Sequence, residues 1–174
     1  MTRSCSASAT VTVAEACVAD TGVFLRWFVD QDGFEHAREL QRKLAEGSAA
    51  VETPDFARVE VAGVLRKKGL LAGRLTVDEF TAAVRVIDDM GVTVHETTAD
   101  RLERAAGLAA RKTIGMYDAL FVQLAQELKL PLLTSDAKLG RAVDGTIQVE
   151  LLHGIGNLPL SSSQPKLREE GQPD

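Results

Sequence analysis

The chain has 174 residues, of which 45% are hydrophobic and 26% are charged, and its formal net charge at pH 7 is −5. This length and composition predict one globular domain with a sizeable core. The negative charge argues against a generic basic nucleic-acid binder, although a nuclease whose own acids hold cations would be acidic. No apolar run is long enough to cross a bilayer, so we expect no membrane segment, and the first residues lack the pattern of a secretory signal.

Cysteine and histidine usage limits the metals that the chain could bind. Cys5 and Cys17 show neither zinc-site spacing nor a disulfide framework, which suits a reducing compartment, and we therefore expect a cytoplasmic protein. The three histidines, His36, His95 and His153, are scattered along the chain. A bound metal would consequently have oxygen ligands.

Strand and helix patterns alternate along the chain. Short apolar runs predict strands at 16–19, 50–53, 92–94, 132–134 and 147–151. Helical spacing, caps and terminators predict helices at about 23–28, 35–46, 55–68, 77–90, 102–111 and 117–128, and a further helix begins after 136. Because helices separate the strands, we predict an α/β fold with a mostly parallel sheet of about five strands, covered on both faces. We expect the domain to span 15–158, with 1–14 and 159–174 disordered.

The stretch from Thr113 to Arg141 organises these expectations. Its helix carries a predicted core-facing stripe of Tyr117, Leu120, Phe121, Leu124 and Leu128. Asp118 falls close to that stripe, where a carboxylate is costly unless a partner or a metal meets it. Asp136 follows the next apolar strand, and the carboxyl ends of parallel strands are where α/β proteins bind ligands.

Four acids are predicted to meet at this edge of the sheet. Asp20 and Asp136 directly follow strands, whereas Glu60 and Asp118 lie early in helices. Each has an ordinary alternative, because the first two could cap helices, Asp118 could be a favourable charge in a first turn, and Glu60 could be satisfied by an arginine. Two carboxylates about 5 Å apart repel by ~3 kcal/mol at an effective dielectric constant near 20. Four together imply raised pKa values or a divalent cation such as Mg²⁺ or Mn²⁺.

These motifs resemble the PIN domain, and in particular the small VapC-type toxin ribonucleases of toxin–antitoxin pairs. The matching residues are Ala19-Asp20-Thr21, Pro54 with Glu60, Tyr117 to Ala125 (YDALFVQLA) and Leu132 to Asp136 (LLTSD). The similarity covers about 17–152 and implies the three-layer α/β/α fold of that family. One departure is Gly22, where the family commonly has serine, so Thr134 is the candidate to support the first acid instead.

The resemblance implies a Mg²⁺- or Mn²⁺-dependent endoribonuclease that cleaves RNA phosphodiesters with a metal-activated water. Asp20, Glu60, Asp118 and Asp136 would be both the metal-binding and the catalytic residues, with Glu60 acting directly or through water. The resemblance also implies a homodimer and a cognate antitoxin, whose peptide would lie in a groove between the N-terminal helices and whose arginine would reach the acids.

The remaining basic residues and the rival functions complete the expectations. Lys138 and Arg141 are the candidates for contacts with RNA phosphates, because they lie closest in sequence to Asp136. A second basic cluster at 66–74 is interpreted as a solvated surface. One rival is a degenerate, non-catalytic PIN domain that binds RNA or protein. Another is a haloacid-dehalogenase-like phosphatase, which needs a second aspartate where Gly22 stands.

Overall fold

The computed structural model describes residues 15–152, and within them five parallel strands form one sheet in the order β3-β2-β1-β4-β5. The strands are β1 (Ala16–Ala19), β2 (Ala50–Pro54), β3 (Thr93–His95), β4 (Leu132–Thr134) and β5 (Val149–Leu151). The segments 1–14 and 159–174 that were expected to be disordered lie outside the described residues, as does 153–158.

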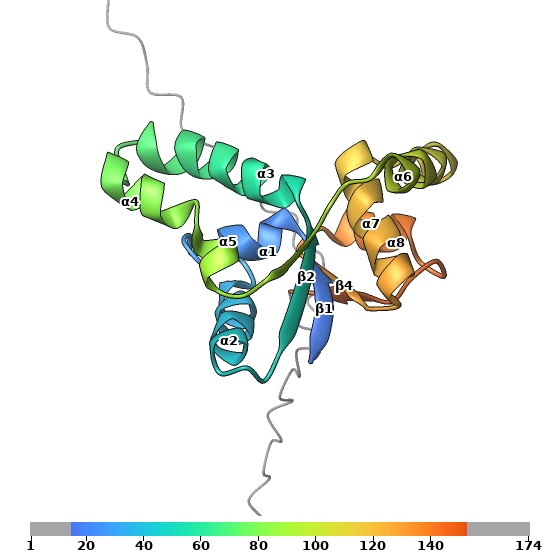
Figure 1. Ribbon diagram of the computed structural model, residues 1–174, viewed down its shortest axis with the longest axis horizontal. Coiled ribbons are helices and arrows are strands. Elements are labelled where there is room, and N and C mark those ends of the chain that lie inside the picture. Colours follow the sequence, from blue (N-terminus) through green and yellow to red (C-terminus); the bar gives the residue numbers. More distant parts are fainter. Residues whose placement is uncertain (1–14, 153–174) are drawn as a thin grey trace, which may run out of the picture.

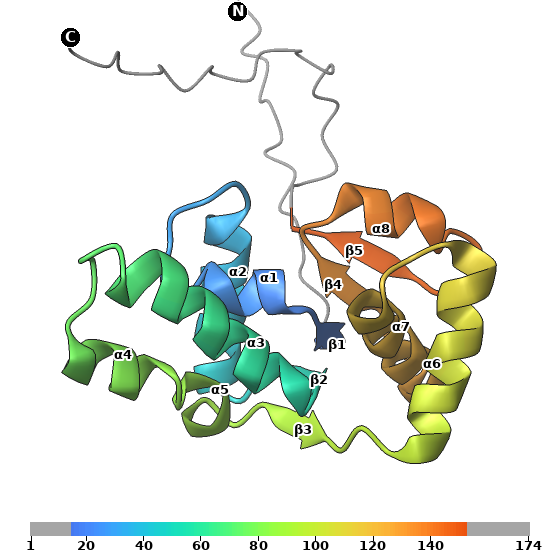
Figure 2. The ribbon, with the colours of Figure 1, turned by 90° about the horizontal axis from the view of Figure 1, so that it is seen from above.

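Helices cover both faces of the sheet. They are α1 (Thr21–Leu25), α2 (Phe34–Ala45), α3 (Phe56–Leu65), α4 (Val77–Ala83), α5 (Val86–Asp89), α6 (Ala99–Lys112), α7 (Met116–Leu128) and α8 (Ala137–Ala142), and the π-helical turn η1 (Arg66–Leu70) continues α3. Figures 1 and 2 show α1 to α5 on one face and α6 to α8 on the other. The predicted three-layer α/β/α arrangement is therefore confirmed.

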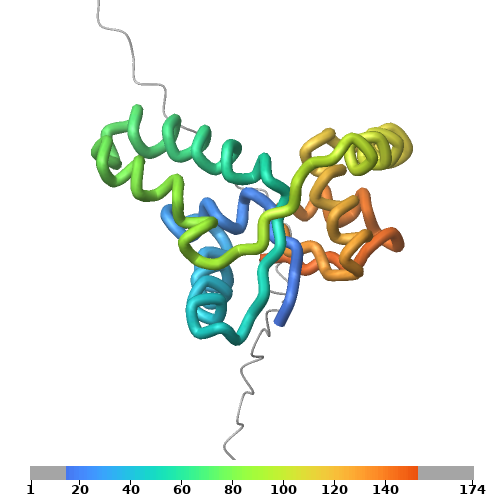
Figure 3. The backbone as a smooth tube through the Cα atoms, viewed as in Figure 1, coloured from blue at the N-terminus to red at the C-terminus, as the bar shows by residue number. Residues whose placement is uncertain are grey.

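The order of the strands brings Asp20 and Asp136 to the same edge of the sheet, because each follows one of two neighbouring strands. From β1 the chain builds β2 and β3 on one side, then returns to place β4 and β5 on the other. Strands β1 and β4 are direct neighbours, with Val18 opposite Leu132 and Ala19 opposite Leu133. Figure 3 shows these segments side by side although most of the chain separates them. The connections diverge here, which makes the carboxyl ends of β1 and β4 a topological switch point.

The central strands are buried because both of their faces are covered. Val18, Leu132 and Leu124 of α7 have almost no exposed surface. On the opposite face, Trp27 is also buried and its indole N–H donates to the carbonyl oxygen of Ala37 at 3.0 Å. No helix within residues 15–152 is long and apolar enough to span a membrane.

Several predicted elements have other bounds in the structure: the helix predicted at 23–28 is Thr21–Leu25, and the one predicted at 102–111 is Ala99–Lys112. The helix predicted between the capping box at Thr76 and Gly91 is divided into α4 and α5, and the division falls at Val84 and Arg85, where the β-branched side chain of Val84 is a weak helix former. Tyr117 was assigned wrongly to the core, because its side chain is 61% exposed. Continuous burial of α7 begins only at Ala119, and the tyrosine ring packs beside Phe56 instead, with centroids 5.2 Å apart.

Candidate metal centre

Two of the four acids occupy matching positions after neighbouring strands. Asp20 follows β1 and caps α1, and its Oδ1 accepts from the backbone N–H of Val23 at 3.1 Å. Asp136 caps α8 after β4, and its Oδ1 accepts from the N–H groups of Lys138 at 2.7 Å and Leu139 at 3.1 Å. Both acids are therefore helix caps, and the caps hold them at the carboxyl edge of the sheet.

Thr134 links these two positions. Its side chain is fully buried at the end of β4, and its hydroxyl donates to the carboxylate of Asp20. The same hydroxyl accepts from the backbone N–H of Asp136 at 2.9 Å. One side chain thus connects the first acid to the loop that carries the last.

A second threonine connects the Asp20 segment to α3. The hydroxyl of Thr21, the first residue of α1, donates to the carboxylate of Glu60 across 39 residues of sequence. The sequence analysis allowed for an arginine paired with Glu60, but the hydrogen bond to Glu60 comes from Thr21. Glu60 is thereby held beside the helix that Asp20 caps.

Asp118 completes the group from the first turn of α7. Its pKa is raised, first by burial and then by the negative charge of Asp136, and Glu60 adds a smaller effect in the same direction. A hydrogen bond from the backbone of Gly115 opposes these effects. The charges of Asp136 and Glu60 therefore act on Asp118, and the threonine hydrogen bonds connect Asp20 to the segments of Asp136 and Glu60.

The carboxylate of Asp20 is the most strongly perturbed acid of this group. Burial raises the pKa of Asp20 to about 6. The donors Thr134, Val23 and Gly22 and the charge of Arg26 lower the pKa, but they do not cancel the cost of burial. An enclosed carboxylate with this cost is stabilised when a cation approaches it.

The donor set suits a hard divalent cation, although the side chains do not converge on a single point. Among residues 15–152, no three acidic, histidine or cysteine side chains are placed so that together they could hold a metal ion. All four predicted ligands nevertheless offer carboxylate oxygens, and Asp118 faces negative charge from two other acids. Mg²⁺ and Mn²⁺ prefer oxygen ligands, so the chemistry of the group fits either ion.

Arg26 and Ser135 belong to this region and were missed by the sequence analysis. Arg26 is only 8% exposed, and its Nη1 donates to the carbonyl of Gly22 at 2.8 Å and to Ser135 Oγ at 3.0 Å. The signal that could have revealed it was an arginine between Leu25 and Trp27, inside a segment that is otherwise apolar.

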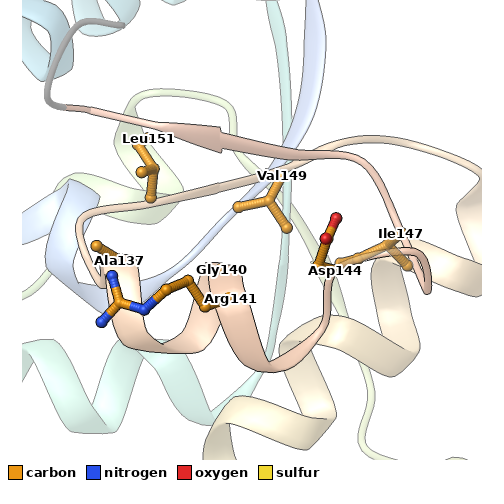
Figure 4. Close-up of a pocket in the computed structure, with 7 residues that line it drawn as sticks. All are labelled: Ala137, Gly140, Arg141, Asp144, Ile147, Val149 and Leu151. Carbon is orange, nitrogen blue, oxygen red and sulfur yellow. The ribbon is translucent and has the colours of Figure 1, made fainter. Parts of the chain in front are cut away.

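The candidate RNA contacts lie on α8, beyond Asp136. Lys138 and Arg141 are both exposed. A cavity of about 490 Å³ between α8 and β5 is lined by Ala137, Gly140, Arg141, Asp144, Ile147, Val149 and Leu151. Figure 4 shows Arg141 extending along α8 toward Ala137. None of the four acids lines this cavity, so it is separate from the acidic group.

The family of the chain follows from a sequence comparison. The model of the PIN domain family matches residues 17–144, which is most of the chain. The chain therefore belongs to the PIN domain family. This assignment leaves the phosphatase alternative without support. A separate comparison with curated protein sequences found no match.

Solved structures agree on the fold at low sequence identity. A toxin–antitoxin complex from Klebsiella pneumoniae has a TM-score of 0.57 and 18% identity, covering 80% of this chain and 99% of that one. VapC20 of Mycobacterium tuberculosis, described as a sarcin–ricin loop cleaving toxin, has a TM-score of 0.56 and 19% identity over 72% of this chain and 94% of its own. PAE2754 from Pyrobaculum aerophilum has a TM-score of 0.57 and 18% identity, covering 77% of this chain and 83% of that one.

Proposed function

We propose that this PIN domain is a divalent-metal-dependent endoribonuclease and the toxin of a type II toxin–antitoxin pair. The observations that support the proposal are the hydrogen bonds that Thr134 and Thr21 donate to Asp20 and Glu60, together with the effect of the Asp136 and Glu60 charges on Asp118. Membership of the PIN family supports it, as do the toxins among the structural neighbours.

In this proposal the four acids would hold the metal. Asp20, Asp118 and Asp136 would bind Mg²⁺ or Mn²⁺, and Glu60 would contribute directly or through a water molecule. A bound cation would supply a water of lowered pKa and would stabilise negative charge on the phosphate. Thr134 and Thr21 orient two of the carboxylates through their hydroxyl groups. No side chain of the protein is needed as a nucleophile.

The RNA backbone would approach over the start of α8. Lys138 and Arg141 are exposed cations on the helix that Asp136 caps. Contacts of this kind bind phosphates without reading sequence and weaken as salt concentration rises. They would hold RNA against a site whose own charge is negative.

The antitoxin would occupy a groove of about 380 Å³ between the α1–α2 segment and α3. Its lining is mostly apolar and basic, with one acid, Asp30, that pairs with Arg38 at 2.7 Å. The lining residues are Leu25, Phe28, Val29, Asp30, Gln31, Arg38, Val64, Leu65, Lys68, Gly69, Arg74 and Leu75. An amphipathic peptide with acidic residues matches this surface. The groove begins at Leu25, the last residue of the helix that Asp20 caps, so an arginine of a bound peptide could extend toward the acids.

Cleavage of RNA with Mg²⁺, compared with EDTA and with Glu60→Gln, tests the nuclease proposal. We expect cleavage by the parent with the metal, and loss of cleavage in both comparisons. Cleavage that persists in EDTA would contradict the metal mechanism. RNA binding without cleavage under any metal condition would instead identify a non-catalytic PIN domain. Sedimentation of the purified chain tests the homodimer that the resemblance implies.

A further inference from the structure

Gly22 lies where an added side chain would meet the acidic site. A Cβ atom at this position would be 2.6 Å from Ser135 Oγ, 3.1 Å from Asp20 Oδ1 and 3.4 Å from Arg26 Nη1. The first of these separations is shorter than any normal contact, so a larger residue would displace the Ser135 hydroxyl. The absence of a side chain at residue 22 thus leaves room for the Ser135 hydroxyl in the place where Arg26 binds it.

Arg26 fixes the Ser135 hydroxyl in that place. Its Nη1 bonds to Ser135 Oγ at 3.0 Å and to the Gly22 carbonyl at 2.8 Å, and its Nε donates to the Asp32 carbonyl at 2.6 Å. The guanidinium therefore joins three segments, which are the start of α1, the β4–α8 connection and the loop before α2. A rigid, planar group with several donors can hold such a set, whereas the single ammonium of a lysine cannot reproduce it.

Ser135 is the residue between Thr134 and Asp136. Thr134, at the end of β4, already forms a hydrogen bond with Asp20. The hydrogen bond between Arg26 and Ser135 is a second link, between residues that are 109 positions apart in sequence. Both links connect the segment carrying Asp20 to the segment carrying Asp136. Thr134 contacts the Asp20 carboxylate directly, whereas the Arg26–Ser135 bond joins the segments that carry the two acids.

We propose that Arg26 and Ser135 are positioning residues that set the spacing of Asp20 and Asp136 for a divalent cation, and that residue 22 must be glycine for Ser135 to do so. This inference rests on the proposed metal-dependent function. It adds to that function a coupling between residues 22 and 135. A side chain added at residue 22 and the hydroxyl of Ser135 would occupy the same space. The effects of substitutions at positions 22 and 135 are therefore not independent.

A double-mutant cycle tests this coupling. The variants are Gly22→Ser, Ser135→Ala and the combination of both. The measurements are the apparent Mn²⁺ affinity, from the Mn²⁺-induced rise in Tm, and the Mn²⁺ dependence of RNA cleavage. We expect each single variant to weaken Mn²⁺ affinity about tenfold, as loss of groups that orient ligands does. The double variant should bind Mn²⁺ at least as tightly as the single variant with the lower affinity. The reason is that removing the Ser135 hydroxyl makes room for the serine added at residue 22.

Matched controls separate this effect from general damage. Gly63→Ser places the same side chain in helix α3, where an added Cβ has no neighbour within 4 Å. Ser48→Ala removes a hydroxyl that donates only to the exposed carbonyl of Lys43. We expect both to keep the parent's Mn²⁺ affinity. Arg26→Lys retains the charge but not the planar set of donors, and we expect it to weaken Mn²⁺ affinity about tenfold.

The outcomes distinguish the inference from the function on which it rests. If the two single effects multiply in the double variant, or if Arg26→Lys retains the parent's affinity, the positioning role is overturned while the nuclease proposal stands. If the parent itself neither binds Mn²⁺ nor cleaves RNA, both proposals fail. Sub-additive losses with a weakened Arg26→Lys support the inference.

Discussion

The hydroxyl of Thr134 donates a hydrogen bond to the carboxylate of Asp20, although 114 residues separate the two in sequence. This bond exists because β1 and β4 are neighbours at the switch point of the sheet. The same hydroxyl also accepts from the N–H of Asp136. The topology of the sheet therefore determines how two of the proposed metal ligands are held.

Thr134→Val should separate the role of this hydroxyl in the site from its role in stability. The substitution keeps the shape but removes a donor to a buried carboxylate, so we expect the free energy of unfolding to fall by about 1–3 kcal/mol. Metal-dependent cleavage should fall about 10- to 100-fold. Urea unfolding and cleavage kinetics at saturating RNA measure the two effects.

Thr53→Val is the matched control. Thr53 is equally buried in β2, and its hydroxyl donates to the carbonyl of Ala19 at 3.1 Å. We expect a loss of stability with little change in cleavage by the folded protein. Equal losses of cleavage in the two variants would show that Thr134 supports only the fold.

Asp118→Asn should abolish cleavage while leaving the fold intact. The neutral amide removes a proposed metal ligand, and it also removes the repulsion by which Asp136 and Glu60 raise the pKa of Asp118. The metal-free variant should consequently be at least as stable as the parent at pH 7. Circular dichroism, thermal unfolding and an RNA cleavage assay check these outcomes.

Asp100→Asn provides a control for Asp118→Asn. Asp100 lies in the first turn of α6, as Asp118 lies in the first turn of α7, but its side chain is exposed and apart from the acidic group. Its substitution should leave the cleavage rate unchanged. An Asp118→Asn protein that cleaves at the parent rate would remove Asp118 from the site.

The raised pKa of Asp20 predicts a pH-dependent stability in the absence of metal. Because the folded-state pKa is about 6 and the ordinary value is 3.8, the folded protein binds the proton more tightly. This stabilising effect is complete below pH 3.8 and is lost as pH rises through 6. Relative to Asp20→Asn, the parent should therefore lose up to about 3 kcal/mol between pH 4 and pH 7.

Chemical unfolding of both proteins in EDTA across this pH range measures the difference. Adding Mn²⁺ at pH 7 should stabilise the parent and not Asp20→Asn. A difference in unfolding free energy that is constant with pH would show that Asp20 titrates normally and is not held at an energetic cost.

Lys138 and Arg141 are expected to contribute to RNA binding and not to the chemical step. The variant with both changed to alanine should raise KM, lower the salt dependence of binding and leave kcat nearly unchanged, because phosphate contacts release counterions. Arg66→Ala with Lys67→Ala removes two exposed cations from η1 and serves as the control. Equal changes in both pairs would assign the effect to net charge alone.

The sequence was most informative where local patterns carry the structure. The apolar runs at 16–19 and 132–134 are the neighbouring strands β1 and β4, and the acids after them cap helices at the carboxyl edge. Both features depend on residues that are adjacent in the chain. The helical pattern around Asp118 likewise placed it in the first turn of α7.

The parts that the sequence did not reveal depend on contacts between distant segments. Nothing local indicates that Arg26 reaches Ser135, because the bond exists only once β1 and β4 are paired. Tyr117 was assigned to the core by its periodicity, yet periodicity does not tell where along a helix burial begins. The lack of room for a side chain at Gly22 likewise depends on the positions of Ser135 and Arg26 in the folded protein, which the sequence does not give.

The central claim is that these acids bind one or more divalent cations, and anomalous diffraction from a crystal of the protein soaked in Mn²⁺ tests it most directly. The account predicts an anomalous peak coordinated by carboxylate oxygens of Asp20, Asp118 and Asp136, with Glu60 bound directly or through water. Mn²⁺ found elsewhere, or a well-ordered site that remains empty at saturating Mn²⁺, would contradict it.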